Sequence, residues 1–308
     1  MQICKVSVVL CVHNGERFVR ETIDSVLAQT FREFEFIIWN DGSTDSTEEI
    51  IKSYHDPRIR YYSQAFGCFG TVSHYANMAA RGKYIAKIDA DDVCMPDRIQ
   101  KEFDFLESHP DHCLVSSAVV FIDEQSREMG RNFPYTLPRH LSRLFMVAHP
   151  GAMYRRDIYM QTCGYQSVRW AEDKLLWSKM LRHGKFANLR EPLLKYRLVS
   201  TSITNSRAAG GVYARILDEM IVKMCLDETI LPEDVELCNT IYTYTCREKS
   251  DKKQPPVHHK TWEEKLYALM TPLVGKSLAE WSVYAVQNLH GYWKLRHLHD
   301  YSFPCVKS

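Results

Sequence analysis

The sequence predicts an α/β fold in which helices flank a doubly wound, mostly parallel β-sheet. Short β-branched and apolar runs alternate with segments whose apolar residues recur at helical spacing, and this pattern occurs three times in succession. The apolar runs lack the alternation of apolar and polar residues that marks a half-exposed strand, as expected of strands buried on both faces. A change to helical segments beyond residue 207 adds a helical C-terminal extension.

The first unit is a strand, a helix and a second strand. Residues 6–12 are a compact apolar run that predicts a buried strand. Apolar residues recur at helical spacing over residues 16–29, and residues 34–39 predict the second strand. This order is that of the repeating unit in a doubly wound sheet.

The pattern then repeats towards an acidic motif. Residues 40–45 predict a turn whose Ser, Thr and Asp side chains can cap the helix that follows. A short strand is expected at residues 58–62, a helix at 72–80 and a strand at 83–88. The last of these strands leads directly into the acidic motif at residues 89–92 (DADD).

Polar residues follow three of the predicted strands at the point where each strand ends. They are His13 and Asn14, Asn40 and Asp41, and the acidic motif at 89–92. In doubly wound sheets, ligands bind beyond the carboxyl ends of the strands. The sequence therefore predicts one ligand site where these tips meet.

Composition and charge exclude several classes of protein. The 39 basic and 38 acidic side chains leave a net charge of +1, so no global field is present to hold a nucleic acid. The 10 cysteines are scattered without a C-x-x-C pair, which favours a reducing compartment, and we expect the cytoplasm. The sequence shows neither a signal peptide nor a run of about 18 apolar residues, so no membrane span is predicted.

The length of 308 residues allows a main domain with an appendage. We predict the main domain at residues 1–207 and a helical region at 208–308. Within that region, residues 262–299 interleave aromatic and basic side chains. They can pack against the main domain, form a homodimer, or associate peripherally with an anionic membrane surface on its cytoplasmic face.

Adjacent carboxylates in the acidic motif would repel one another if they were buried without a counter-charge. A divalent cation removes this repulsion, and hard oxygen ligands select Mn²⁺ or Mg²⁺, whose other positions are filled by water and substrate phosphates. The motif thus predicts a substrate that carries a diphosphate. The alternative is a solvated acidic turn before the helix that begins near Pro96. An EF-hand loop is excluded because its sixth and twelfth positions are Cys94 and Gln100.

A phosphoaspartyl enzyme is a further alternative for the motif. Asp89, Asp91 and Val93 satisfy the pattern D-x-D-x-[TV], so the motif resembles that of the haloacid dehalogenase family. In that family the motif follows the first strand, whereas two strand–helix units precede it here. A phosphohydrolase or phosphotransferase that uses Asp89 or Asp91 stays open.

Six segments together resemble the inverting glycosyltransferases of family 2, which have a GT-A nucleotide-sugar-binding fold. The resemblance covers roughly residues 4–205. Its segments are VSVVLCVHNGERFVRETIDSVLAQTF, FEFIIWNDGSTDST, GKYIAKIDADDVCMPDRI, HPGAMYRR, GYQSVRWAEDKLLW and KYRLVSTSIT. Their order and spacing make the set specific, and residues 1–207 become the catalytic domain in this interpretation.

The resemblance implies how the donor nucleotide is bound. His13 stands where the family has an aromatic residue that stacks on the base, and Asp41 where a carboxylate hydrogen-bonds the base, usually uracil. Asp89 matches the carboxylate near the ribose. The expected nucleotide-binding set also contains Asn14, Glu16 and Ala90.

The resemblance also implies the catalytic groups. Asp91 matches the metal ligand that bridges to the diphosphate, and Asp173 matches the general base. An acceptor hydroxyl has a pKa far above neutral pH, so a carboxylate must take its proton as the new bond forms. A single in-line displacement inverts the anomeric centre without a covalent enzyme intermediate.

Four further residues are candidates for the acceptor site, each with a structural alternative. Glu172 could touch the acceptor or the donor sugar, or simply be an acid in the first turn of a helix. Trp177 could offer an aromatic face to a sugar or pack in the core. His149 matches a segment under the acceptor site or is a structural histidine, and Arg197 could reach a phosphate or pair with an acid.

Three positions depart from the family pattern. Cys11 replaces the usual Pro, His13 replaces the usual aromatic residue, and Asn40 replaces the first of two turn acids. Asp41 is retained, so a UDP-linked donor is expected. The predicted function is metal-dependent, inverting transfer of a sugar to a hydroxyl of a saccharide or lipid-linked saccharide, in polysaccharide or glycoconjugate assembly. A catalytically inactive sugar-binding protein with this fold is the third hypothesis.

Overall fold

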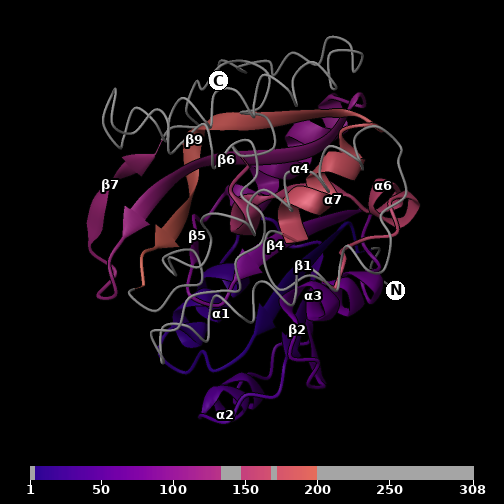
Figure 1. Ribbon diagram of the computed structural model, residues 1–308. Coiled ribbons are helices and arrows are strands. Elements are labelled where there is room, and N and C mark those ends of the chain that lie inside the picture. The colour runs from indigo at the N-terminus through magenta and orange to yellow at the C-terminus, as the bar shows by residue number, and fades with distance from the viewer. Residues whose placement is uncertain (1–3, 133–146, 168–171, 200–308) are drawn as a thin grey trace, which may run out of the picture. The chain divides into compact units, whose positions relative to one another are not determined.

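The computed structural model of the protein describes residues 4–132, 147–167 and 172–199. Its strands are β1 (Val6–Val12), β2 (Phe34–Asn40), β3 (Ile59–Ser63), β4 (Tyr84–Asp89), β5 (Val93–Cys94), β6 (His112–Ile122), β7 (Glu128–Asn132), β8 (Met153–Arg155) and β9 (Lys185–Arg197). Over the described residues they form one sheet in the order β3-β2-β1-β4-β8-β6-β9-β5, and β7 pairs with β6 (Figure 1). The region 208–308, with its predicted membrane and homodimer contacts, lies outside the described residues.

Seven helical segments accompany the strands within these ranges. They are α1 (Val19–Leu27), α2 (Thr47–Lys52), α3 (Phe69–Met78), α4 (Arg98–Ser108), the short 3-10 helix η1 (His149–Gly151), α6 (Arg156–Gln161) and α7 (Glu172–Met180). Apolar residues of α1 and α4 pack on one face of the sheet. On the other face, Ser73 and Asn77 of α3 contact Cys11 of β1 and Tyr154 of β8. The predicted α/β fold is therefore confirmed.

The first half of the sheet is parallel. β1 pairs in parallel with both β2 and β4, and β2 pairs in parallel with β3. Every residue of β1 and β2 is buried, which explains why neither run alternates between apolar and polar residues. Their buried positions include Cys11, whose thiol packs as a small apolar side chain.

The second half of the sheet is mixed. β8 is antiparallel to both β4 and β6, β9 is parallel to β6, and β5 is antiparallel to β9. β8 thus joins the two halves, and β5 brings the segment just after the acidic motif against the end of β9. This pairing fixes the motif between strands that are far apart in the sequence.

A buried ion pair supports the strand that carries the motif. Arg98 and Glu102 of α4 are both almost fully buried, and Nε of Arg98 donates to Oε1 of Glu102 over 3.1 Å. Nη2 of Arg98 donates to the backbone oxygen of Lys87 on β4 over 2.7 Å. Burial raises the pKa of Glu102 to about 7, against the opposing effect of the Arg98 charge. Removal of either side chain would therefore leave the other one buried without its partner.

We expect Glu102→Ala to lower the free energy of unfolding by about 3–5 kcal/mol, because it leaves the buried guanidinium without its carboxylate. Urea denaturation followed by circular dichroism measures this change. Glu48→Ala is the control, since Glu48 pairs with Lys52 on the exposed surface of α2 and its loss should leave the unfolding midpoint nearly unchanged. Equal midpoints for the two variants would contradict the expectation.

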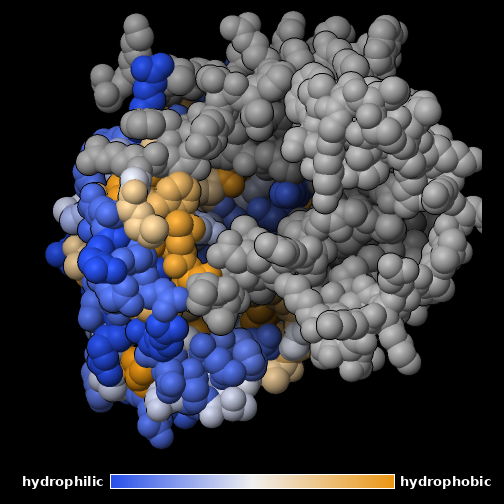
Figure 2. All heavy atoms as spheres, turned by 60° about the vertical axis from the view of Figure 1, so that its left-hand side comes forward, coloured by the Kyte–Doolittle hydropathy of each residue, from blue (hydrophilic) through white to orange (hydrophobic). Residues whose placement is uncertain are grey.

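On the face that Figure 2 shows, the described residues are mainly hydrophilic, with a band of hydrophobic residues between polar areas. Large hydrophobic side chains that are exposed include Tyr75, Met78 and Met129. Among the described helices, none has the length and apolar character needed to cross a membrane.

Candidate active site

Parallel pairing brings the ends of β1, β2 and β4 to one edge of the sheet. Val12 pairs with Asn40 across β1 and β2, and Cys11 pairs with Asp89 across β1 and β4. The polar residues that follow these three strands are therefore neighbours, as expected for parallel strands in a doubly wound sheet.

His13 and Asp41 lie together beyond β1 and β2. Nδ1 of His13 lies 2.9 Å from the backbone oxygen of Asp41, and the His13 side chain is exposed. Oδ1 of Asp41 accepts hydrogen bonds from the backbone N–H groups of Phe66 and Gly67. An exposed ring beside a fixed carboxylate can provide a stacking face and a hydrogen-bond acceptor for a planar ligand.

A row of four packed aromatic side chains, which includes Phe66, lies next to this pair. Trp39 stacks on Tyr62 with ring centroids 5.0 Å apart, and Phe66 stacks on Tyr75 at 4.7 Å. Trp39 also contacts Phe66, with 5.9 Å between the centroids. The row anchors the segment whose N–H groups hold Asp41. Residue spacing does not reveal it, because the four residues come from different elements and meet only in the folded chain.

Asn14 and Glu16 connect two loops. Oδ1 of Asn14 accepts a hydrogen bond from the N–H of Thr44 at 2.8 Å, and the N–H of Asn14 donates to Oγ of Ser43 at 2.9 Å. Oε2 of Glu16 accepts from the N–H of Ser46 at 3.0 Å. Asn14 has a φ of 53°, a conformation that asparagine tolerates better than most residues. In this structure, both predicted nucleotide-binding residues fasten the loop after β1 to the loop after β2.

An acidic cluster lies at the carboxyl end of β4. It consists of Asp89 and Asp91 from the motif, and Glu172 and Asp173 from the start of α7. Burial raises the pKa of Asp89 to about 6, and the charges of Asp91 and Asp173 add to the effect. Burial and the charges of Asp173 and Asp89 raise the pKa of Glu172 to about 8. The two acids at the start of α7 therefore lie within electrostatic range of Asp89 in the acidic motif.

Lys87 is a buried cation beside the acidic cluster. It precedes Asp89 by two residues on β4, so both side chains lie on the same face of the strand. Among the described residues, its Nζ atom has no hydrogen-bond partner, and it lies 5.6 Å from the ring centroid of Phe69. Its charge opposes the rise in the pKa of Asp89 and of Glu172. A lysine within an otherwise apolar strand was the sequence signal for this residue.

We expect Glu172→Gln to stabilise the metal-free protein as the pH rises. The folded-state pKa of about 8 lies above the usual glutamate value, so Glu172 contributes stability below about pH 4 that is lost as the pH rises through about 8. The variant has no charge to bury, so its advantage in urea unfolding should grow between these limits. Parallel stability curves for wild type and variant would contradict this. Glu49→Gln, at an exposed site on α2, is the control.

His149 and Trp177 lie in the interior next to Glu172. Nε2 of His149 lies 2.8 Å from the Tyr165 hydroxyl, and its Nδ1 lies 4.0 Å from Oε1 of Glu172. Burial lowers the pKa of His149 well below its usual value. The Trp177 side chain is 0 % exposed and makes edge-to-face contacts with His149 and Tyr154. The indole thus packs in the core, so its ring face is not open to a sugar here.

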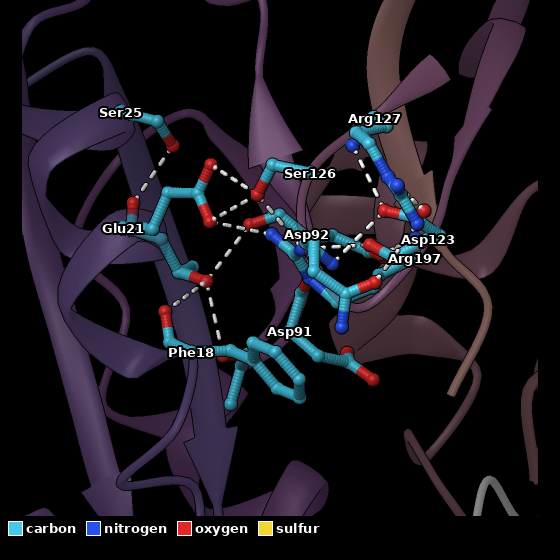
Figure 3. Close-up of polar contacts among 12 residues, drawn as sticks. Phe18, Glu21, Ser25, Asp91, Asp92, Asp123, Ser126, Arg127 and Arg197 are labelled. Atoms are coloured by element: carbon cyan, nitrogen blue, oxygen red, sulfur yellow. Dashed lines mark hydrogen bonds and ion pairs between the residues drawn. The ribbon is translucent and has the colours of Figure 1, made fainter. Parts of the chain in front are cut away.

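Arg197 and Ala90 are also held by neighbouring groups. The backbone oxygen of Ala90 accepts a hydrogen bond from Oγ1 of Thr22 at 3.0 Å. Arg197 is almost fully buried, and its Nη2 donates to Oε2 of Glu21 at 2.6 Å (Figure 3). Of the two roles expected for Arg197, the structure therefore shows the ion pair with an acid.

The acidic cluster fits a divalent cation that shares its coordination with a ligand. In the described part of the chain, no three His, Cys, Asp or Glu side chains form a complete metal site. Mg²⁺ and Mn²⁺ in phosphate-binding sites need only one or two protein carboxylates, because phosphates and water supply the rest. Oδ1 of Asp89 is buried without a hydrogen-bond partner in the described residues. A cation would compensate the charge that this oxygen and Asp91 carry.

The fold matches solved structures of enzymes that bind nucleotide sugars. TarS of S. aureus, residues 1–349, solved in complex with UDP-GlcNAc, superposes with a TM-score of 0.62 at 17% identity and covers 98% of this chain and 94% of its own. The mannosyltransferase PcManGT from Pyrobaculum calidifontis, in complex with GDP-Man and Mn²⁺, superposes with a TM-score of 0.54 at 13% identity, covering 95% and 87%. The chain therefore has the fold of the GT-A glycosyltransferases.

Sequence comparison identifies the family. The profile of glycosyl transferase family 2 matches residues 7–162. The putative glycosyltransferase EpsE of Bacillus subtilis is 32% identical over 203 residues, which cover 63% of this chain and 73% of EpsE. The chain belongs to glycosyl transferase family 2, and it is a glycosyltransferase.

Proposed function

We propose that this enzyme is an inverting, metal-dependent glycosyltransferase that moves a sugar from a UDP-linked donor to a hydroxyl of a saccharide or lipid-linked saccharide. Asp41 and Asp91 follow strands that both pair with β1, and the charge of Asp173 acts on Asp89 of the same motif; this arrangement carries the proposal. The complex of TarS with UDP-GlcNAc and that of PcManGT with Mn²⁺ support a nucleotide sugar and a divalent cation as ligands. We further propose that the reaction takes place in the cytoplasm.

The nucleoside end of the donor would bind at His13 and Asp41. The exposed His13 ring can stack on a base, and Asp41 can accept a hydrogen bond from the ring N–H of uracil. Because Phe66 and Gly67 donate to Oδ1 of Asp41, the carboxylate is oriented before the nucleotide arrives. Asp89 would lie near the ribose.

The diphosphate end would bind at the acidic cluster. Asp91 would hold the cation, with Asp89 beside it, and the bound cation would offset the negative charge that develops on the leaving diphosphate. Lys87 is buried next to the same carboxylates. Its charge reduces the cost of placing several acids in one region with little solvent.

Asp173 would act as the general base. It takes the proton from the acceptor hydroxyl while the oxygen forms a bond to the anomeric carbon and the bond to the diphosphate breaks. Burial raises the pKa of Asp173, which makes the carboxylate a better proton acceptor than a solvated aspartate. Because the acceptor attacks opposite the leaving group in a single displacement, the configuration is inverted.

A thermal-shift screen tests the proposal. UDP, GDP, ADP and CDP are added with and without Mn²⁺, because a ligand that binds only the folded state raises its stability. We expect the largest rise in Tm for UDP with Mn²⁺. Equal shifts for all nucleotides, or a trappable aspartyl-phosphate at Asp89 or Asp91, would overturn it in favour of non-specific binding or of phosphoryl transfer. Binding without turnover of any UDP-sugar would indicate an inactive sugar-binding protein.

A further inference from the structure

Arg197 binds three segments that surround the acidic motif. Its Nε donates to the backbone oxygen of Asp91 at 2.7 Å. Its Nη1 donates to the backbone oxygen of Asp123 and to Oγ of Ser126, both at 2.9 Å, and its Nη2 binds Oε2 of Glu21 at 2.6 Å (Figure 3). The side chain therefore links the motif, the turn between β6 and β7, and α1.

The backbone of Arg197 is held in return by the motif. Oδ1 of Asp92 accepts a hydrogen bond from the N–H of Arg197 at 2.8 Å. Asp92 is 1 % exposed, and its backbone oxygen accepts from Oγ1 of Thr22 at 2.8 Å. Arg197 thus binds Asp91 through its side chain and Asp92 through its backbone, so consecutive residues of the motif are fixed by one residue at the end of β9.

The bond from Arg197 to Asp91 leaves the carboxylate available. Arg197 binds the backbone oxygen of Asp91, and the Asp91 carboxylate points away from the guanidinium (Figure 3). The Arg197 guanidinium is paired with Glu21 and lies 4.6 Å from the ring centroid of Phe18, while its charge partly offsets the rise that burial causes in the pKa of Asp91. An arginine that paired with the Asp91 carboxylate would compete with a cation for the same oxygens.

We propose that Arg197 is a positioning residue of the donor site, which holds the Asp91 turn so that the Asp91 carboxylate meets the cation and the donor diphosphate. The proposal rests on the proposed function, in which Asp91 binds that cation. It gives Arg197 a role in donor binding through the backbone of the motif, in place of the direct contact with a phosphate that was one of the two roles expected from the sequence.

The test measures how UDP affinity depends on Mn²⁺ in Arg197→Gln and Arg197→Lys. Neither side chain can donate in the three directions that the guanidinium serves. We expect the Mn²⁺ concentration for half-maximal UDP binding to rise about tenfold or more, which corresponds to about 1.4 kcal/mol. The affinity for uridine, which has no phosphate, should change less than about twofold. A residue that merely supports the fold would weaken both ligands together.

Two further variants keep the test decisive. Arg127→Gln is the matched control, because Arg127 pairs with the Asp123 side chain on the same β6–β7 turn and is 74% exposed. It should leave both affinities unchanged. Glu21→Gln keeps the hydrogen bonds from Arg197 to the backbone. It should raise the Mn²⁺ concentration for half-maximal UDP binding as the Arg197 variants do, but by less. This variant replaces the Arg197 variants in the test if they fail to fold.

The outcomes separate the two proposals. Wild-type UDP binding that does not respond to Mn²⁺ would overturn the proposed function and this inference with it. A normal response in wild type that is unchanged in the Arg197 variants, or in Glu21→Gln when those variants do not fold, would overturn only this inference. An equal loss of uridine and UDP affinity would also overturn it, since Arg197 would then support the fold in general.

Discussion

An Asp91→Ala variant is expected to lose the Mn²⁺-dependent part of UDP binding and to lose sugar transfer by at least about 10²–10³-fold, the range found when a group that stabilises developing charge is removed. Asp91 stands at the carboxyl end of β4, in a turn held by Arg197. Without its carboxylate, the cation would lose its main protein ligand and the leaving diphosphate would lose the compensation of its charge.

Isothermal titration of UDP with and without Mn²⁺ measures the first part, and release of UDP from a panel of UDP-sugars measures the second. Asp97→Ala is the control, because Asp97 follows the motif, makes no capping hydrogen bond to α4, and pairs with Lys101. An Asp91→Ala variant that binds UDP with the wild-type Mn²⁺ dependence would show that the cation, if present, is held elsewhere.

An Asp173→Asn variant is expected to lose transfer by about 10²–10⁴-fold while UDP affinity stays within about twofold of wild type. The amide keeps the shape of the side chain but cannot take a proton from the acceptor. Donor binding should survive because the nucleoside contacts at His13 and Asp41 lie beyond β1 and β2, on different elements from α7.

Single-turnover transfer with saturating donor separates this chemical defect from a binding defect. Glu172→Gln is the matched comparison, since Glu172 is the neighbouring acid on α7 and has a pKa raised to about 8 by burial and by the charge of Asp173. It should retain measurable transfer. If Glu172→Gln is inactive and Asp173→Asn is active, the roles of the two acids are reversed.

The first half of the fold could be predicted from the sequence because its signals are local. β1 and β2 are buried apolar runs that end at polar turns, and such runs are recognisable without knowledge of their neighbours. β8 has three residues and becomes a strand only because it pairs with β4 and β6. β9 contains exposed residues such as Arg190 and Glu191. The mixed half of the sheet thus depends on long-range pairing that local patterns do not contain.

The same distinction holds for the site. Asp41 and Asp91 stand directly after predicted strands, so their positions followed from the motif and from the parallel sheet. The setting of Arg197 depends on the pairing of β9 with β5 and β6, which places its N–H against Asp92. The burial of Lys87 depends on Phe69 of α3 and on η1, which contacts β4. Neither environment could be derived from residue spacing.

The hydrogen bonds that Asn14 and Glu16 make to Thr44 and Ser46 have a consequence for the kinetics of ligand capture. Two loops that are tied together before any nucleotide arrives need no costly rearrangement to receive its base. Most molecules then already have the loop conformation that binds the nucleotide. The apparent affinity is therefore not reduced by the need to populate a rare conformation first. Uridine should therefore associate in one fast, concentration-dependent phase, and loosening this tie by Asn14→Ala should add a slower phase that does not depend on ligand concentration.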